Sequence, residues 1–387
     1  MTAFERIVTD WRRAGRIALG FSVLVASTCA GAESARNTAS IQVIGRAERS
    51  AGAWRATWPG VAWRTAFSGS RVGVTIRDVA GYGVAIDGIR MNPIRPSRTR
   101  QTTWYRGLAA GSHSVEAIRM RGTPRSPGLF FGFSKGADGR WLALPPSPNR
   151  QIEFIADSGS SGYGNLSPTV DCTDEEVESR SDASQSYPII AAHALHADWQ
   201  LNAMNGIGVV RNWHGIWHGT NYATYGQLTL QSDSASRYRD FDWQPRAAVV
   251  QIGANDFGSP LAADEPWTPV QLEQEFTKGF RDLLMELRHR LGPNGLIIVI
   301  QPAFGENPAN QHVAEIVDSM RLGGDQRLYE LQFPKLELTG CDSHPNLSDH
   351  RLMSTTLVKF IEDHGVQEAL SARSLVNRAR SGTLAGP

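Results

Sequence analysis

The sequence is poor in cysteine and has almost no excess of charge. Only three of its 387 residues are cysteine, and 39 lysines and arginines face 38 aspartates and glutamates. With no long basic stretch, the chain is not expected to bind nucleic acid. The apolar stretch from Ile17 to Ala26 is too short to span a membrane. The remaining composition, 41% hydrophobic and 20% charged, allows well-buried cores, and the length is typical of two domains.

The N-terminus has the pattern of an export signal. Basic residues precede the apolar stretch and a small-x-small site follows it: Arg12, Arg13 and Arg16, then Ala30-Gly31-Ala32. We therefore predict a signal peptide at residues 1–32 and a secreted or periplasmic mature chain without stable membrane insertion. A twin-arginine signal at Arg12-Arg13 and a lipidated Cys29 are alternative interpretations of this segment.

Cleavage after Ala32 would leave two cysteines, Cys172 and Cys341. In an oxidising compartment two such residues can form a disulfide. Two separate buried thiols are the alternative, and the sequence leaves both open.

The region from about Ile41 to Leu144 has the pattern of an antiparallel β-structure. Its short alternating or β-branched runs, such as RVGVTIRDV and HSVEAIRM, are separated by turns that contain glycine or proline. This spacing predicts a β-sandwich or jelly-roll domain at residues 38–147. The proline-rich segment LPPSPNR, from Leu144 to Arg150, is the expected boundary.

Strand and helix patterns alternate after this linker. Strands are expected at 151–157, 247–256, 295–302 and 327–333, and helices at 187–199, 270–291, 310–324 and 346–365. Apolar strands interleaved with helices predict a parallel sheet covered on both faces, an α/β domain at residues 148–370. The polar residues 371–387 are expected to form a flexible tail.

Three separated blocks carry residues suited to nucleophilic catalysis: Asp157-Ser158, Gly253-Ala254-Asn255-Asp256 and Asp342-Ser343-His344-Pro345. A serine hydroxyl needs a base to accept its proton, and histidine is the usual base. The developing oxyanion needs fixed donors such as backbone N–H groups or an asparagine amide. The first two blocks follow predicted strands, whose carboxyl ends line the ligand crevice in such folds.

These blocks resemble the motifs of the SGNH (GDSL-like) hydrolases. The run ADSGSSGYGN, followed by IGANDF and GCDSHPN, is similar more narrowly to carbohydrate esterase family two, the acetyl (xylan) esterases with an N-terminal jelly roll. The resemblance covers nearly all of the mature chain. It implies a three-layer α/β/α hydrolase domain behind a jelly-roll domain, and a serine esterase that removes O-acetyl groups from carbohydrate through an acetyl-enzyme.

The resemblance also assigns roles to individual residues. Ser158 matches the nucleophile, and its N–H matches one oxyanion donor. Gly206 matches the second donor, with Gly208 as its rival, and Asn255 matches the side-chain donor. His344 matches the general base.

The orienting acid is less regular. Asp342 is the candidate, but it lies two residues before His344, whereas the wider superfamily places the acid three residues before the histidine. Some members of the narrower family use a backbone carbonyl instead. His350 is a competing base, although it lies in the expected last helix and we favour the loop residue His344.

Aromatic residues near these blocks are candidates for stacking on sugar rings: Tyr163, Trp213 and Trp217. Plain packing is the alternative for each. His214 and His218 have the spacing of metal ligands on a helix, but flanking glycines and the lack of a third ligand argue for an ordinary loop.

We therefore expect an esterase without a metal or organic cofactor, acting as a monomer on acetylated polysaccharide or oligosaccharide. Two alternatives stay open: a non-catalytic carbohydrate-binding protein on the same scaffold, and a lipase or cell-wall O-acetyl esterase of the same superfamily.

Overall fold

The computed structural model describes residues 39–148, 150–217, 219–239 and 243–364. The predicted signal peptide and the predicted tail lie outside these residues. The described residues, from Ala39 to His364, belong to one compact unit. In the described part of the chain, no helix combines the length and apolar character needed to cross a membrane.

The first part of the unit is an antiparallel β-sandwich, as predicted. One sheet, which we call sheet A, has the order β1-β4-β9-β6-β7, with β11 paired to β4. Its strands are β1 (Gln42–Ile44), β4 (Ala62–Ser68), β6 (Tyr82–Ile86), β7 (Ile89–Arg90), β9 (Ser112–Arg119) and β11 (Arg140–Leu142). The other, sheet B, has the order β2-β3-β10-β5-β8. Its strands are β2 (Glu48–Ser50), β3 (Ala53–Ala56), β5 (Arg71–Arg77), β8 (Gln101–Arg106) and β10 (Gly128–Lys135).

The second part is built on a parallel sheet of five strands in the order β13-β12-β14-β15-β16. The strands are β12 (Gln151–Ala156), β13 (Asp198–Ala203), β14 (Ala247–Gln251), β15 (Leu296–Ile300) and β16 (Leu328–Leu331). From β12 the chain crosses to β13 on one side and then to β14 on the other. The carboxyl end of β12 is therefore the topological switch point, where ligands bind in open α/β sheets.

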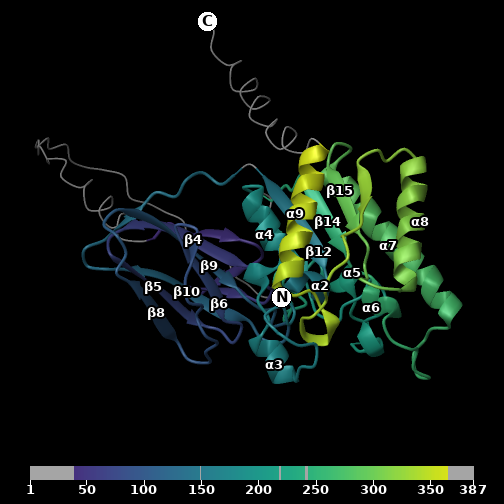
Figure 1. Cartoon of the computed structure of the whole chain (residues 1–387), viewed down its shortest axis with the longest axis horizontal. Helices are drawn as coiled ribbons and strands as arrows, with labels where there is room; N and C mark the ends of the chain where they lie inside the picture. The colour runs from purple at the N-terminus through teal and green to yellow at the C-terminus, as the bar shows by residue number, and fades with distance from the viewer. Residues whose placement is uncertain (1–38, 149, 218, 240–242, 365–387) are drawn as a thin grey trace, which may run out of the picture. The chain divides into compact units, whose positions relative to one another are not determined.

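Helices cover both faces of this sheet, which confirms the predicted α/β fold (Figure 1). The longer helices are α4 (Tyr187–Ala194), α7 (Pro269–Leu291), α8 (Pro308–Leu322) and α9 (Leu347–Asp363). Shorter helical segments are α2 (Ser158–Ser161), α3 (Asp174–Ser179), η1 (Ala183–Gln185), η2 (Trp213–Gly215), α5 (Tyr222–Tyr225), α6 (Ala254–Phe257) and η3 (Cys341–Ser343). Phe154 and Ile155 are consecutive in β12 and belong to different buried clusters, as expected of a strand covered on both faces.

The structure corrects one predicted element. The helix expected at residues 187–199 ends at Ala194, and Asp198 already begins β13, a strand that the sequence pattern did not suggest. All six residues of β13 are buried, although three of them are polar.

Sheet A packs against the second part of the unit. The indole N–H of Trp199 donates to the Gly60 carbonyl over 2.8 Å, and Arg64 forms an ion pair with Asp198 at 3.1 Å. A Cβ atom at Gly83 would lie 2.3 Å from the Ser184 hydroxyl, so the two backbones approach closely there. The sandwich is thus held to the parallel sheet by hydrogen bonds, an ion pair and tight packing.

Candidate active site

Ser158 lies where β12 ends and α2 begins. Asp157 caps this short helix, with its Oδ1 accepting from the Gly159 N–H over 3.0 Å. The first N–H groups of a helix have no intrahelical partner, so the Ser158 N–H is available to an incoming oxyanion.

The small residues after Ser158 allow a second loop to approach the nucleophile. A Cβ atom at Gly164, where φ is +55°, would lie 2.3 Å from the Cβ of Cys341. A Cβ atom at Gly162 would lie 2.6 Å from the Asp182 carbonyl oxygen. A larger residue at Gly164 would therefore push the segment with Cys341 away, and a larger residue at Gly162 would displace the segment with Asp182.

His344 contacts Ser158 directly. Its Nε2 lies 2.8 Å from the Ser158 Oγ, and its Nδ1 lies 3.0 Å from the carbonyl oxygen of Cys341 and 3.1 Å from that of Asp342. Carbonyl oxygens only accept, so in the neutral ring Nδ1 carries the proton and donates it. The Nε2 lone pair is then free to accept the serine proton, which is the arrangement of a nucleophile and its general base.

The predicted orienting role of the Asp342 carboxylate is not what the structure shows. Asp342 and Ser343 both have left-handed backbone angles, with φ of 52° and 57°. This turn directs the Asp342 main-chain oxygen toward His344, while the carboxylate accepts from the Tyr163 hydroxyl over 2.7 Å. Backbone carbonyls therefore orient the imidazole, which is the alternative that the sequence left open.

Tyr163 lies beside the imidazole. The centroids of the Tyr163 and His344 rings are 4.4 Å apart. Burial, and after it the hydrogen bond to Asp342, raises the pKa of the Tyr163 hydroxyl, which therefore stays protonated and keeps donating. These two contacts of Tyr163, to Asp342 and to the imidazole, hold the histidine loop, and its predicted contact with a sugar ring stays a prediction.

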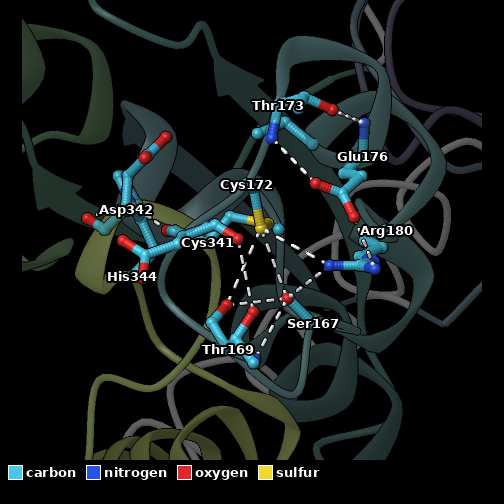
Figure 2. Close-up of a disulfide and its surroundings, with 12 residues drawn as sticks. Ser167, Thr169, Cys172, Thr173, Glu176, Arg180, Cys341, Asp342 and His344 are labelled. Atoms are coloured by element: carbon cyan, nitrogen blue, oxygen red, sulfur yellow. Dashed lines mark hydrogen bonds and ion pairs between the residues drawn. A yellow bond between two sulfur atoms is a disulfide. The ribbon is translucent and has the colours of Figure 1, made fainter.

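A disulfide joins the two loops, as the sequence allowed. Cys172 and Cys341 are bridged across 169 residues, and Figure 2 shows the bridge next to Asp342 and His344. The Cys341 N–H donates to the Gly164 carbonyl over 3.2 Å, and the Asp342 N–H donates to the Val170 carbonyl over 2.8 Å. The bridge and these hydrogen bonds fix the Cys341 carbonyl that orients His344.

The candidate oxyanion donors meet at the same end of the sheet. Gly206 follows β13 with φ of +75°, and its N–H has no hydrogen-bond partner among the described residues. Its rival Gly208 donates its N–H to the Asn212 side chain over 3.0 Å. The geometry therefore favours Gly206, together with the Ser158 N–H.

Asn255 is buried beside these donors. Its amide nitrogen donates to the Asp157 carboxylate over 3.1 Å and to the Ile207 carbonyl over 2.8 Å. Both amide hydrogens are thus engaged with protein groups. In this geometry the side chain braces the loop that carries Gly206, and it can serve an oxyanion only by releasing one of the two contacts.

Two buried carboxyl groups lie under the site. Burial raises the pKa of Asp157 to about 7, and the neighbouring Asp256 carboxylate adds to this effect. Burial likewise raises the pKa of Asp256 to about 6, although this carboxylate accepts three backbone N–H groups, from Val209, Val210 and Arg211. Asp256 thereby holds the segment after Gly206 in place.

Comparison with known proteins agrees with this geometry. The family model "Carbohydrate esterase 2 N-terminal" matches residues 43–145. An acetylxylan esterase / glucomannan deacetylase of Cellvibrio japonicus is 28% identical over 79% of this chain and 84% of its own length. A family two carbohydrate esterase from Clostridium thermocellum, solved with cellohexaose, superposes with a TM-score of 0.75 at 26% identity, over 84% of this chain and 99% of that one.

The chain is thus similar to the carbohydrate esterases of family two, and these comparisons support a carbohydrate esterase. More distant structures share its fold, among them a putative GDSL-like lipase from Bacteroides ovatus, with a TM-score of 0.53 at 15% identity. The cellulase/esterase CelE of Acetivibrio thermocellus is 26% identical over 80% of this chain, which spans 37% of that longer protein.

His350, the competing base, lies outside the candidate active site. It is 1% exposed in α9, and its Nδ1 accepts from the Tyr187 N–H over 3.2 Å. Its Nε2 is buried without a hydrogen-bond partner among the described residues. Burial lowers the pKa of His350 to about 3, so the ring stays neutral and acts as a core residue.

The two predicted stacking tryptophans are accessible. Trp213 is 43% exposed and Trp217 37% exposed. The main-chain N–H of Trp213 donates to the Gly206 carbonyl over 2.9 Å, which places this residue beside the oxyanion donor. Trp217 lines a cavity of about 110 Å³ together with Asn205 and, from the loops of the sandwich, Pro59.

The suggested histidine pair carries no metal site in the described residues. His214 has a left-handed φ of 54° and does not lie on a regular helix, while His218 is outside the described residues. No group of three or more potential ligands occurs among the residues that the structure describes.

Sequence reasoning missed two contributors to the site. The Cys341 carbonyl has no side-chain signal, and only the loop conformation reveals its contact with His344. Asp256 was part of the recognised block, but its role depends on three backbone N–H groups of a distant segment. Neither contact can be predicted from the residues next to it in the sequence.

Proposed function

We propose that this chain is an exported serine esterase that removes O-acetyl groups from carbohydrate, with Ser158 as nucleophile and His344 as general base. The observation that carries the proposal is the 2.8 Å contact between the Ser158 Oγ and the His344 Nε2, with the other ring nitrogen on two carbonyl oxygens. The relatives named acetylxylan esterase / glucomannan deacetylase support acetylated xylan and glucomannan as the first substrates to test.

In the first half of the reaction, Nε2 of His344 takes the proton from the Ser158 hydroxyl as Oγ attacks the acetyl carbonyl. The N–H groups of Ser158 and Gly206 stabilise the oxyanion. The carbonyl oxygens of Cys341 and Asp342 stabilise the imidazolium that forms. This imidazolium then protonates the departing sugar oxygen, which leaves an acetyl ester on Ser158.

In the second half, a water molecule gives a proton to Nε2 of His344 and attacks the acetyl ester. The same donors hold the second oxyanion, and the returning proton restores the Ser158 hydroxyl as acetate leaves. Each step uses groups of this chain and water, so the scheme needs no metal or organic cofactor.

The proposal includes the predicted division of the chain into a signal peptide at 1–32, a β-domain at 38–147, a hydrolase domain at 148–370 and a tail at 371–387. The mature chain would act as a monomer outside the cytoplasm. N-terminal sequencing of the exported protein tests the cleavage site, and light scattering of the purified protein tests the monomer.

Release of acetate by wild type and Ser158→Ala tests the function. We expect wild type to release acetate from p-nitrophenyl acetate, acetylated xylan and acetylated glucomannan, and Ser158→Ala to lose activity by about three or more decades. Ser348→Ala, an exposed serine at the start of α9, is the matched control and should keep full activity. No acetate release by wild type, with retained binding of xylan, would favour the non-catalytic alternative.

A further inference from the structure

Charge is distributed unevenly between the two parts of the chain, although the total is nearly neutral. Residues 39–148 contain sixteen basic and five acidic side chains, whereas residues 149–364 contain fifteen basic and twenty-nine acidic ones. The β-sandwich is therefore strongly cationic and the hydrolase part strongly anionic. Such a segregated charge favours binding of an oppositely charged partner.

Part of the positive charge of the sandwich is neutralised by the hydrolase part. Ion pairs join Arg46 to Glu153, Arg64 to Asp198, Arg90 to Asp182 and Arg121 to Glu178. The four arginines come from sheet A or from the segments next to its strands. These ion pairs neutralise arginines on the side of the sandwich that packs on the hydrolase part. They do not neutralise the arginines of sheet B.

Sheet B presents a different set of arginines on its outer face. In the register of β5 and β8, Arg71 lies opposite Arg106, Gly73 opposite Trp104, and Thr75 opposite Thr102. Residues opposite each other in paired strands have side chains on the same face of the sheet. Because side chains alternate between the two faces along a strand, Arg77 on β5 and Arg100 just before β8 lie on this face as well. In Figure 1, β5 and β8 lie on the side of the sandwich away from the parallel sheet.

The result is a platform with an arginine at each corner, which we call the arginine platform: Arg71, Gly73, Thr75, Arg77, Arg100, Thr102, Trp104 and Arg106. Arg77 lies six residues after Arg71 on β5, which corresponds to about 20 Å along the strand. A Cβ atom at Gly73 would lie 3.1 Å from the Trp104 ring, so the indole rests on the bare backbone of the neighbouring strand.

None of the four corner arginines forms an ion pair with a carboxylate among the described residues. Arg71 and Arg106 lie over the Trp104 ring, with guanidinium carbons 5.6 Å and 5.5 Å from its centroid. Asp138 hydrogen-bonds Ser70, and these bonds lower its pKa more than the nearby Arg71 does. The cationic groups are thus held in place by an aromatic ring and remain available to an external anion.

We propose that the arginine platform binds an anionic polysaccharide, a chain that carries uronic acid carboxylates. A guanidinium can pair with a carboxylate through two parallel hydrogen bonds, and the Trp104 ring holds the guanidinium groups of Arg71 and Arg106 in position for such pairs. A two-stranded surface of this length suits an extended chain. The platform would hold the esterase on acidic, acetylated material while the catalytic site works on another segment.

The inference goes beyond the proposed function and can fail independently of it. Binding is measured in the Ser158→Ala background by isothermal titration with polygalacturonate free of acetyl esters. Neutral galactan of similar length and a DNA duplex serve as comparison ligands. Deacetylation of p-nitrophenyl acetate by the same platform variants with Ser158 restored tests catalysis separately, and we expect it to stay unchanged.

We expect Arg71→Ser/Arg106→Ser to weaken polygalacturonate binding by about tenfold or more, and Trp104→Ala to weaken it several-fold, since charge-assisted pairs and ring contacts are both removed. The control Arg140→Ser/Arg351→Ser removes two exposed charges elsewhere and should change binding by about twofold or less. Raised salt should weaken wild-type binding. If Trp104→Ala alters folding, Arg77→Ser/Arg100→Ser replaces it with the same expectation as the first pair.

Three results would overturn the proposal. The first is an equal loss of polygalacturonate affinity in the platform pair and in the control pair, which would show that binding depends on overall charge and not on a defined site. The second is unchanged binding in the platform pair. The third is DNA binding as tight as polygalacturonate binding and equally sensitive to the platform pair, which would assign the surface to nucleic acid.

Discussion

His344 and His350 lie six residues apart, the first in a loop and the second in helix α9, and their imidazole rings have opposite surroundings. His344 is half-buried and has polar partners at both ring nitrogens, with Ser158 on one side and two carbonyls on the other. His350 is buried in α9, with one nitrogen accepting a backbone N–H and the other without a partner among the described residues. Partners, more than residue type or chain position, decide which histidine can act as a base.

Alanine substitution of the two histidines should separate activity from stability. We expect His344→Ala to lower kcat by about three or more decades with a normal melting temperature, because the proton acceptor is lost from an accessible loop. His350→Ala should keep kcat within about threefold of wild type and lose about 2–4 kcal/mol of unfolding free energy, because it leaves a cavity and an unpaired Tyr187 N–H. Steady-state kinetics and urea denaturation of both variants check this. The opposite pattern would move the base to α9.

Breaking the disulfide should affect the histidine loop and leave the helix intact. We expect Cys172→Ala to lower the free energy of unfolding by about 2–5 kcal/mol, the usual cost of losing a native bridge. Activity should also fall, because the Cys341 carbonyl that orients His344 loses its anchor. The measurements are kcat and thermal unfolding of wild type, of Cys172→Ala and of wild type treated with a thiol reductant. Full activity in the reduced wild type would show that the hydrogen bonds suffice.

The Asp342 carboxylate should matter less than its backbone. Since the carboxylate contacts Tyr163 and not His344, Asp342→Asn and Tyr163→Phe should each lower kcat by about tenfold or less. Because the two side chains share one hydrogen bond, the double variant should lose little more than either single one. A loss in Asp342→Asn as large as that of Ser158→Ala would instead make the carboxylate an indispensable member of the catalytic set.

The pH dependence should differ between the two histidines. Burial lowers the pKa of His344, and its role as base needs the neutral ring, so kcat/KM should fall with decreasing pH only below the ordinary histidine pKa of about 6.5. For His350 the folded pKa of about 3 lies below the unfolded value. The unfolded state therefore binds more protons than the folded state. The contribution of His350 to stability is complete above the unfolded pKa and is lost as pH falls toward 3. The difference in unfolding free energy between wild type and His350→Gln should be constant above the unfolded histidine pKa of about 6.5 and should shift against wild type as pH falls below it.

The comparison also shows how far the sequence alone could lead. The apolar runs and helical periodicity located β12, β14, β15 and the long helices, because these patterns depend on neighbours in the chain. Strand β13 could not be predicted because its polar residues are buried against partners that are distant in the sequence: Asp198 pairs with Arg64, and Asn202 donates to Glu153. A strand whose burial is compensated by such distant groups has no local apolar signature.

The active site follows the same division. Ser158 and His344 could be named from their motifs, since the chemistry requires those side chains. The orienting group could not, because it is a backbone oxygen placed by two left-handed residues, Asp342 and Ser343, and by a bridge to Cys172. The arginine platform could not be predicted either, because it depends on the register in which β5 pairs with β8.

The most direct test of the central claim is to detect the acetyl group on Ser158. Wild type and His344→Ala are mixed with p-nitrophenyl acetate, quenched in acid and digested, and the peptide containing Ser158 is examined by mass spectrometry. We predict an added acetyl group on Ser158 in wild type during turnover, little or none in His344→Ala, and none in Ser158→Ala. Acetate release by wild type without acetyl on Ser158, or with acetyl on another residue, would contradict the account.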